Sequence, residues 1–97
     1  MPKRFWIAEI RISEAMETKI RERRFVTGDE VREACIPDAY ERAGWHDHPE
    51  HGRRLLVVGR TAQGKRLKII LQPVNVDEGI WRLRTVLLPS AGKADGA

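Results

Sequence analysis

The chain has 97 residues, of which 41% are hydrophobic and 33% are charged, and its formal net charge is +4 with a sequence pI of about 9.7. These values indicate one small globular domain and argue against a disordered chain. No apolar run in the sequence approaches the roughly 18 residues that a membrane-spanning helix needs. We therefore expect no membrane partner. The single cysteine excludes an internal disulfide and a cysteine-based zinc site, and it favours the reducing cytoplasm.

The first predicted element is a strand over residues 4–12, which we place at an edge of the sheet. Alternate side chains of this segment are apolar, namely Trp6, Ala8, Ile10 and Ile12. A helix is predicted to follow, with Ser13 as its N-cap, because Glu14 and Glu17 then lie near the positive end of the helix dipole. Met16 and Ile20 lie four residues apart and would form the apolar side of this helix.

The segment FVTGDEVREACIP carries the clearest local signal. Thr27 and Glu30 have the spacing of a capping box, so a second helix is predicted to begin there and to end near Ile36, before Pro37. The apolar stripe of this helix consists of Val31, Ala34 and Cys35. We interpret Cys35 as a core residue rather than a nucleophile, because it lies within that stripe.

Residues 37–52 are predicted to form a long polar connection, with one helical turn near residues 39–42. This connection contains all three histidines, His46, His48 and His51. Clustered imidazoles suit metal binding or acid–base chemistry, and both roles stay open as alternatives. Because the neighbouring residues are loop formers and a flexible loop is a poor preorganised site, we expect a solvated loop, no metal and no cofactor.

Three strands are predicted to complete the domain. The segments 53–60 and 65–72 form a hairpin around Gly64, and a looser loop leads to a last strand over residues 80–88. The predicted fold is α+β, a small single domain in the order β-α-α-β-β-β with an antiparallel sheet packed on two helices. This domain covers residues 1–89, and residues 90–97 are predicted to be a disordered tail.

The strands alternate apolar and basic side chains. We expect one face of the sheet to pack on the helices through Leu67, Ile69, Leu71 and Leu83, and the alternation of the last strand adds Trp81, Thr85 and Leu87 to that face. The opposite face is expected to carry Arg66, Lys68, Arg82 and Arg84, framed by Arg54 and Arg60. Residues 53–84 hold eight cations and two anions, a charge of +6, which would attract RNA, DNA or an acidic protein. A merely solvated basic face is the alternative.

Two segments of this chain resemble the BrnT family of bacterial toxins, within the RelE-like group, and a sister family of small domains with the same layout. These segments are RFVTGDEV and GRTAQGKRL, and the resemblance spans residues 19–88. Its most specific part is Gly59-Arg60-Thr61 followed by Gly64-Lys65. The chain departs from the family pattern where Arg24-Phe25 replaces His-Gly and where Thr85-Val86-Leu87 replaces an arginine-bearing segment.

The resemblance implies a type II toxin that cleaves RNA without a metal and has a cognate antitoxin protein as its partner. In that chemistry the ribose 2′-OH attacks the adjacent phosphorus, and cations stabilise the phosphoryl charge. The implied catalytic residues are Arg60, Lys68 and Arg84, and the implied RNA-binding residues are Arg54, Lys65, Arg66 and Arg82. Trp45 and Trp81 are candidates for base stacking. A non-enzymatic module that binds nucleic acid or protein on the same scaffold is the alternative.

Overall fold

The computed structural model describes residues 5–36 and 39–88, and it has two helices and a five-stranded mixed sheet. The helices are α1 (Glu14–Arg24) and α2 (Gly28–Ala34). The strands are β1 (Glu9–Arg11), β2 (Tyr40–His48), β3 (Gly52–Arg60), β4 (Arg66–Asn75) and β5 (Ile80–Leu87), arranged in the order β1-β5-β4-β3-β2. This confirms the predicted α+β class. The tail predicted over residues 90–97 lies outside the described residues.

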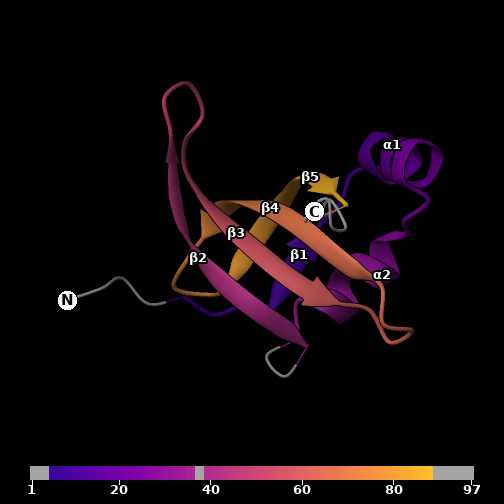
Figure 1. Cartoon of the computed structure of the whole chain (residues 1–97). Helices are drawn as coiled ribbons and strands as arrows, with labels where there is room; N and C mark the ends of the chain where they lie inside the picture. The colour runs from indigo at the N-terminus through magenta and orange to yellow at the C-terminus, as the bar shows by residue number, and fades with distance from the viewer. Residues whose placement is uncertain (1–4, 37–38, 89–97) are drawn as a thin grey trace.

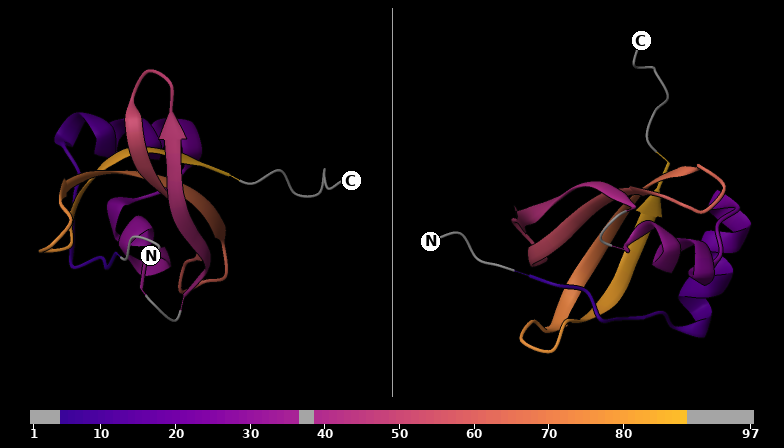
Figure 2. Two further views of the ribbon diagram at one scale, coloured as in Figure 1. Left: turned by 90° about the vertical axis from the view of Figure 1, so that its left-hand side faces the viewer. Right: turned by 90° about the horizontal axis from the view of Figure 1, so that it is seen from below.

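Both helices lie on one face of the sheet, α1 against β5 and α2 against β3 and β4 (Figure 1). Figure 2 shows the same two layers from the side and from below, with the β2–β3 hairpin extending beyond the other strands. We call the face of the sheet that points away from the helices the outer face. It is the face on which the sequence analysis expected basic side chains.

The helix boundaries follow the predicted capping signals. The Ser13 side chain accepts a hydrogen bond from the Met16 amide at the start of α1. At the start of α2, the Thr27 hydroxyl accepts from the Glu30 amide, and the Glu30 carboxylate accepts from the Thr27 amide. These bonds satisfy amides that have no partner inside a helix, so both predicted caps are confirmed.

The first strand is shorter than predicted, because of residues 4–12 only Glu9, Ile10 and Arg11 pair with β5. The amides of Ala8 and Glu9 both donate to the carbonyl of Gly79, which draws the preceding chain over the β4–β5 turn instead of along β5. Ile10 is buried, but Trp6 is 55% exposed and is not part of an apolar strand face. The strand lies at an edge, as predicted, and its parallel pairing makes the sheet mixed rather than antiparallel.

The prediction of a polar connection with a helical turn is wrong for residues 40–48, which form β2. This strand pairs antiparallel with β3, and Ala43 and Trp45 pack against the core. Ala43 and Trp45 are the apolar residues on the buried side of this strand, and the residues between and around them are Gly44 and polar residues. The alternation is therefore weak in the sequence, because a half-exposed edge strand needs few apolar residues. Backbone pairing of eight of its nine residues with β3 supplies what the local sequence does not.

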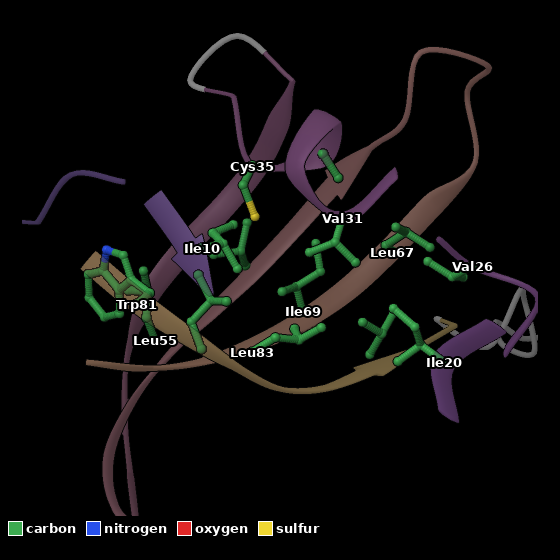
Figure 3. Packing of buried hydrophobic residues seen from close by; sticks show 14 residues of the cluster. Ile10, Ile20, Val26, Val31, Cys35, Leu55, Leu67, Ile69, Trp81 and Leu83 are labelled. Atoms are coloured by element: carbon green, nitrogen blue, oxygen red, sulfur yellow. The ribbon is translucent and has the colours of Figure 1, made fainter. Parts of the chain in front are cut away.

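The core between sheet and helices contains Leu67, Ile69, Leu71 and Leu83, all at most 2% exposed, as predicted. Figure 3 shows Leu67, Ile69 and Leu83 packed with side chains from both helices, among them Ile20 and Val31. Cys35, just after α2, also belongs to this cluster, as the sequence analysis expected.

A bulge in β5 corrects one part of the predicted alternation. Ile70 of β4 pairs with Thr85 while the next residue, Leu71, pairs with Leu83, so Arg84 is an extra residue in β5. Such an insertion reverses which side chains face the core beyond it. Val86 is therefore buried, and the prediction that Thr85 and Leu87 belong to the buried face is wrong.

Candidate nucleic-acid interface

A groove of about 670 Å³ lies on the outer face where β2, β3 and β4 run side by side. Leu56 and Val58 of β3 form its apolar floor. Arg42 and Lys68 pair with Val58 from the two neighbouring strands, so a cation stands on each side of the floor. The other polar lining residues are His46 and Arg66. We call this feature the β2–β4 groove, and it combines an apolar base with a basic rim.

Gly44 keeps the middle of the groove open. It pairs with Leu56, and a Cβ built on Gly44 would meet nothing within 4 Å. Gly44 and Arg42 were not predicted as site residues, because the sequence of this segment is typical of a loop. The signal that would have found them is the alternation of Ala43 and Trp45 with polar or small neighbours, which is typical of a strand with one buried face.

Four cations of the outer face, and Arg84 at the bulge of β5, have no acidic partner in residues 5–36 and 39–88; the four are Arg42, Arg54, Lys68 and Arg82. The Nε atom of Arg54 is buried and has no hydrogen-bond partner in this part of the chain. Elsewhere, Arg21 and Arg32 each have a carboxylate within 4.0 Å. The outer face therefore keeps uncompensated positive charge, as the sequence predicts for Arg54, Lys68 and Arg82.

Glu41 places one anion at the end of the outer face. Its carboxylate accepts hydrogen bonds from Arg60 Nε at 2.7 Å and from Arg66 Nη2 at 2.9 Å. The Arg60 hydrogen bond, together with Arg66, holds the pKa of Glu41 below its usual range. No anion was predicted beside these two arginines, because Glu41 comes from β2, which was not predicted to be a strand.

The implied catalytic residues Arg60 and Arg84 lie far apart. Arg60 pairs with Arg66 at one end of β4, whereas Arg84 is next to the residue that pairs with Ile70. Four residues along a strand span about 13 Å, and β3 and β5 lie two strand spacings apart, about 10 Å. Lys68 lies between them on β4. The two arginines are therefore not placed to contact the same phosphoryl group from their backbone positions.

Arg82 and Arg84 belong to a second basic region at the β5–β1 edge. Arg82 pairs with Arg11 of β1, and the three arginines line a hollow of about 320 Å³. Arg11 is bound to the Glu9 carboxylate at 2.9 Å, so Arg82 and Arg84 are the unpaired cations of this region within the described chain. The outer face thus carries unpaired cations along two edges with apolar side chains between them.

Lys65, another implied RNA-binding residue, lies on the helix side of the sheet. Its Nζ donates to the Phe25 carbonyl at 3.0 Å and is 3.8 Å from the Glu30 carboxylate. Lys65 therefore lies apart from Arg66, its neighbour in sequence. It ties the β3–β4 turn to the segment between the two helices.

The two candidate stacking residues take part in an aromatic cluster. Trp81 is fully buried, and its indole donates to the Trp6 carbonyl at 2.9 Å. The rings of Trp45 and Trp81 are 5.5 Å apart, and Phe5 meets each of them edge to face. Packing inside the domain accounts for the position of both tryptophans.

The rings of His48 and His51 lie against each other with their centroids 4.6 Å apart, whereas His46 occupies a different position along β2. His46 lines the β2–β4 groove, whereas His48 closes the β2–β3 turn by accepting from the amides of Glu50 and His51. Desolvation, with Arg54 and the other histidines nearby, lowers the pKa of His48. Among the described residues, no three side chains of His, Cys, Asp or Glu are grouped to hold a metal ion. Burial raises the pKa of the Cys35 thiol to about 12, so this cysteine is not a thiolate nucleophile at neutral pH.

Acidification is expected to loosen the β2–β3 turn. A protonated Nδ1 of His48 cannot accept from the Glu50 and His51 amides. Folding lowers the pKa of His48, so these hydrogen bonds stabilise the turn fully above about pH 6.5, the ordinary pKa of histidine. Their stabilisation of the turn is lost as the pH falls through the lower pKa of His48 in the folded protein. Hydrogen-exchange protection factors of the two amides should fall as the pH is lowered below about 6.5. They should not fall in His48→Asn, whose side-chain oxygen accepts without titrating, and constant protection in the wild type would contradict the prediction.

No protein-family model matches the chain, and searches of curated proteins and of solved structures likewise found no match. Within the part of the chain that the structure describes, no helix is long and apolar enough to cross a membrane.

Proposed function

We propose that this chain binds single-stranded RNA in the cytoplasm through the outer face of its sheet. The observation that carries the proposal is the set of four outer-face cations, with Arg84 at the neighbouring bulge, that have no acidic partner in the described chain. Phosphates neutralise such cations and release counterions, which supplies most of the affinity of non-specific binding. Leu56 lies between these cations as a half-buried apolar side chain, beside the buried Val58 and Ile70.

The shape of the face favours a single strand over a duplex. Duplex DNA admits an α-helix or a two-stranded ribbon into its major groove, whereas a broad sheet with an apolar floor suits unstacked bases. Fluorescence anisotropy with an RNA of about 12 nucleotides tests the proposal, with duplex RNA and polyglutamate as competitors. The single strand should bind best, with a clear salt dependence. Equal displacement by polyglutamate of the same charge would instead identify the face as a site for an acidic protein.

Replacement of Glu41 with Gln is expected to tighten RNA binding about fivefold at 0.1 M salt. The change removes one negative charge from the face and releases Arg60 and Arg66 to contact phosphates. One or two new contacts should steepen the log–log salt dependence by about 0.7 to 1.4.

The matched control for Glu41→Gln is Asp29→Asn. It removes an equal charge from an arginine pair on α2, away from the outer face. If the two variants bind RNA with the same affinity, Arg60 and Arg66 do not contact the strand.

RNA cleavage by a toxin with a cognate antitoxin is the second candidate function. The observation that favours it is that His46 lines the same groove as Arg42 and Lys68. An imidazole could accept the 2′-OH proton while the neighbouring cations stabilise charge on the phosphoryl oxygens. Membership of the BrnT-like group is part of this second proposal, and it rests on the sequence motifs RFVTGDEV and GRTAQGKRL alone.

Cleavage is tested with RNA in excess EDTA, together with growth arrest on expression and its relief by the product of a neighbouring gene. We expect His46→Gln to lower any cleavage rate about 100-fold. Arg60→Ala and Arg84→Ala test the roles that the resemblance implies. An unchanged rate in His46→Gln would place proton transfer elsewhere, and an inactive wild type that still binds RNA would leave binding as the function.

A further inference from the structure

We infer that the β2–β4 groove seats one unpaired base of the bound strand, an inference that rests on the proposed binding of RNA. The groove has the shape that such a ligand needs. Leu56 and Val58 provide an apolar floor, and Gly44 contributes no side chain above it. Its volume of about 670 Å³ lies within the range of about 300–1,000 Å³ that is usual for pockets holding small organic groups.

The distribution of charge separates a place for a base from places for phosphates. Arg42 and Lys68 flank Val58 in one cross-strand row, and the next row, with Gly44 and Leu56, carries no charge. The row after that pairs His46 with Arg54. A phosphate in the middle row would meet only apolar atoms, so the uncharged row suits the base.

The same three rows give the direction of the strand. Successive rows on one face of a sheet are about 7 Å apart, so the two charged rows lie about 13 Å from each other along β3. Adjacent phosphates of one strand lie closer together than these two rows, so the long side chains of Lys68 and Arg54 would reach toward the middle row to contact them, with the base turned onto the floor. His46 would then lie at the edge of the base, where an imidazole can donate or accept a hydrogen bond.

Gly44→Leu is the variant that tests this inference. The site accepts a side chain, because a Cβ added there would meet no atom within 4 Å and Gly44 has no positive φ. Leucine also suits a strand better than glycine, so the fold should be kept while the groove is filled. Ala62→Leu, at an exposed position in the β3–β4 turn, is the matched control for added apolar surface.

Two probes separate the base from the phosphates: a single-stranded RNA of about 12 nucleotides and inorganic polyphosphate with the same number of phosphates. We expect Gly44→Leu to weaken RNA binding about tenfold and to leave polyphosphate binding unchanged. Gly44→Ala should give a smaller loss in the same direction, and Ala62→Leu should change neither affinity.

Three results would overturn the inference, and they differ in what they say of the proposed function. Unchanged RNA affinity in folded Gly44→Leu would reject the base site and leave electrostatic RNA binding in place. An equal loss for polyphosphate would show that the groove holds phosphate rather than a base. A wild type that binds polyphosphate but no RNA would reject both the inference and the proposed function.

Discussion

Replacement of both Arg42 and Lys68 with Gln is expected to weaken the binding of single-stranded RNA about 25-fold at 0.1 M salt. Each lost phosphate contact should reduce the slope of log affinity against log salt concentration by about 0.7 in magnitude. Because 0.1 M salt is one logarithmic unit below 1 M, the loss of two contacts lowers the affinity by about 1.4 logarithmic units, or about 25-fold. Neither side chain has an acidic partner in the described chain, so the change breaks no ion pair there. Titrations at several salt concentrations measure the affinity and the slope together.

The control for this variant is the replacement of Lys19 and Arg23 with Gln on α1. These two cations are also exposed and without an acidic partner in the described residues, and they lie on the helix side of the sheet. Both double variants lower the net charge equally, so general attraction to RNA falls by the same amount. Equal affinities of the two variants would show that RNA does not use the outer face.

Gly59→Ala is expected to destabilise the fold by at least about 3 kcal/mol, at the upper end of the usual cost of overpacking. A Cβ on Gly59 would overlap the carbonyl oxygen of Ala34 and would lie 3.2 Å from the Cα of Tyr40. Both contacts are with backbone, so no side-chain rotation relieves them and α2 would have to move away from β3. For a domain of this size the melting temperature should fall by more than about 12 °C.

Gly44→Ala is the control for Gly59→Ala, because it makes the same chemical change in the neighbouring strand without a contact within 4 Å. Urea denaturation followed by circular dichroism gives the free energy of unfolding for both variants. A loss below about 1 kcal/mol in Gly59→Ala would mean that the packing of α2 on β3 adjusts easily, contrary to the close approach of these two elements.

This close approach changes how the most specific part of the family resemblance is interpreted. Gly59 lets α2 pack on β3, and buried Thr61 accepts hydrogen bonds from the amides of Gln63 and Lys65 in the following turn. Only Arg60 of the three motif residues presents a charge to solvent, and it is bound to Glu41. The motif is therefore explained largely by packing and turn formation, and it supports a fold more strongly than it supports RNA cleavage.

The predictions that were confirmed rest on interactions between residues close in sequence. The caps at Ser13 and Thr27 involve residues three positions apart, and the burial of Leu67 and Ile69 follows from strict alternation within one strand. Such patterns depend on helix and strand periodicity, which is a local property of the chain. The sequence by itself therefore determined both helices, the last three strands, the α+β class and the basic character of the outer face.

The remaining features were decided by contacts between distant segments. Residues 40–48 become a strand because β3 offers them a backbone edge, and Arg84 becomes an extra residue only in the pairing of β5 with β4. Glu41 then meets Arg60 and Arg66 from 19 and 25 residues away. Strand pairing and ion pairing of this kind depend on which segments lie side by side, and alternation within one strand does not reveal its neighbour. For that reason the β2–β4 groove, with Gly44 open above Leu56, emerged only in the tertiary structure.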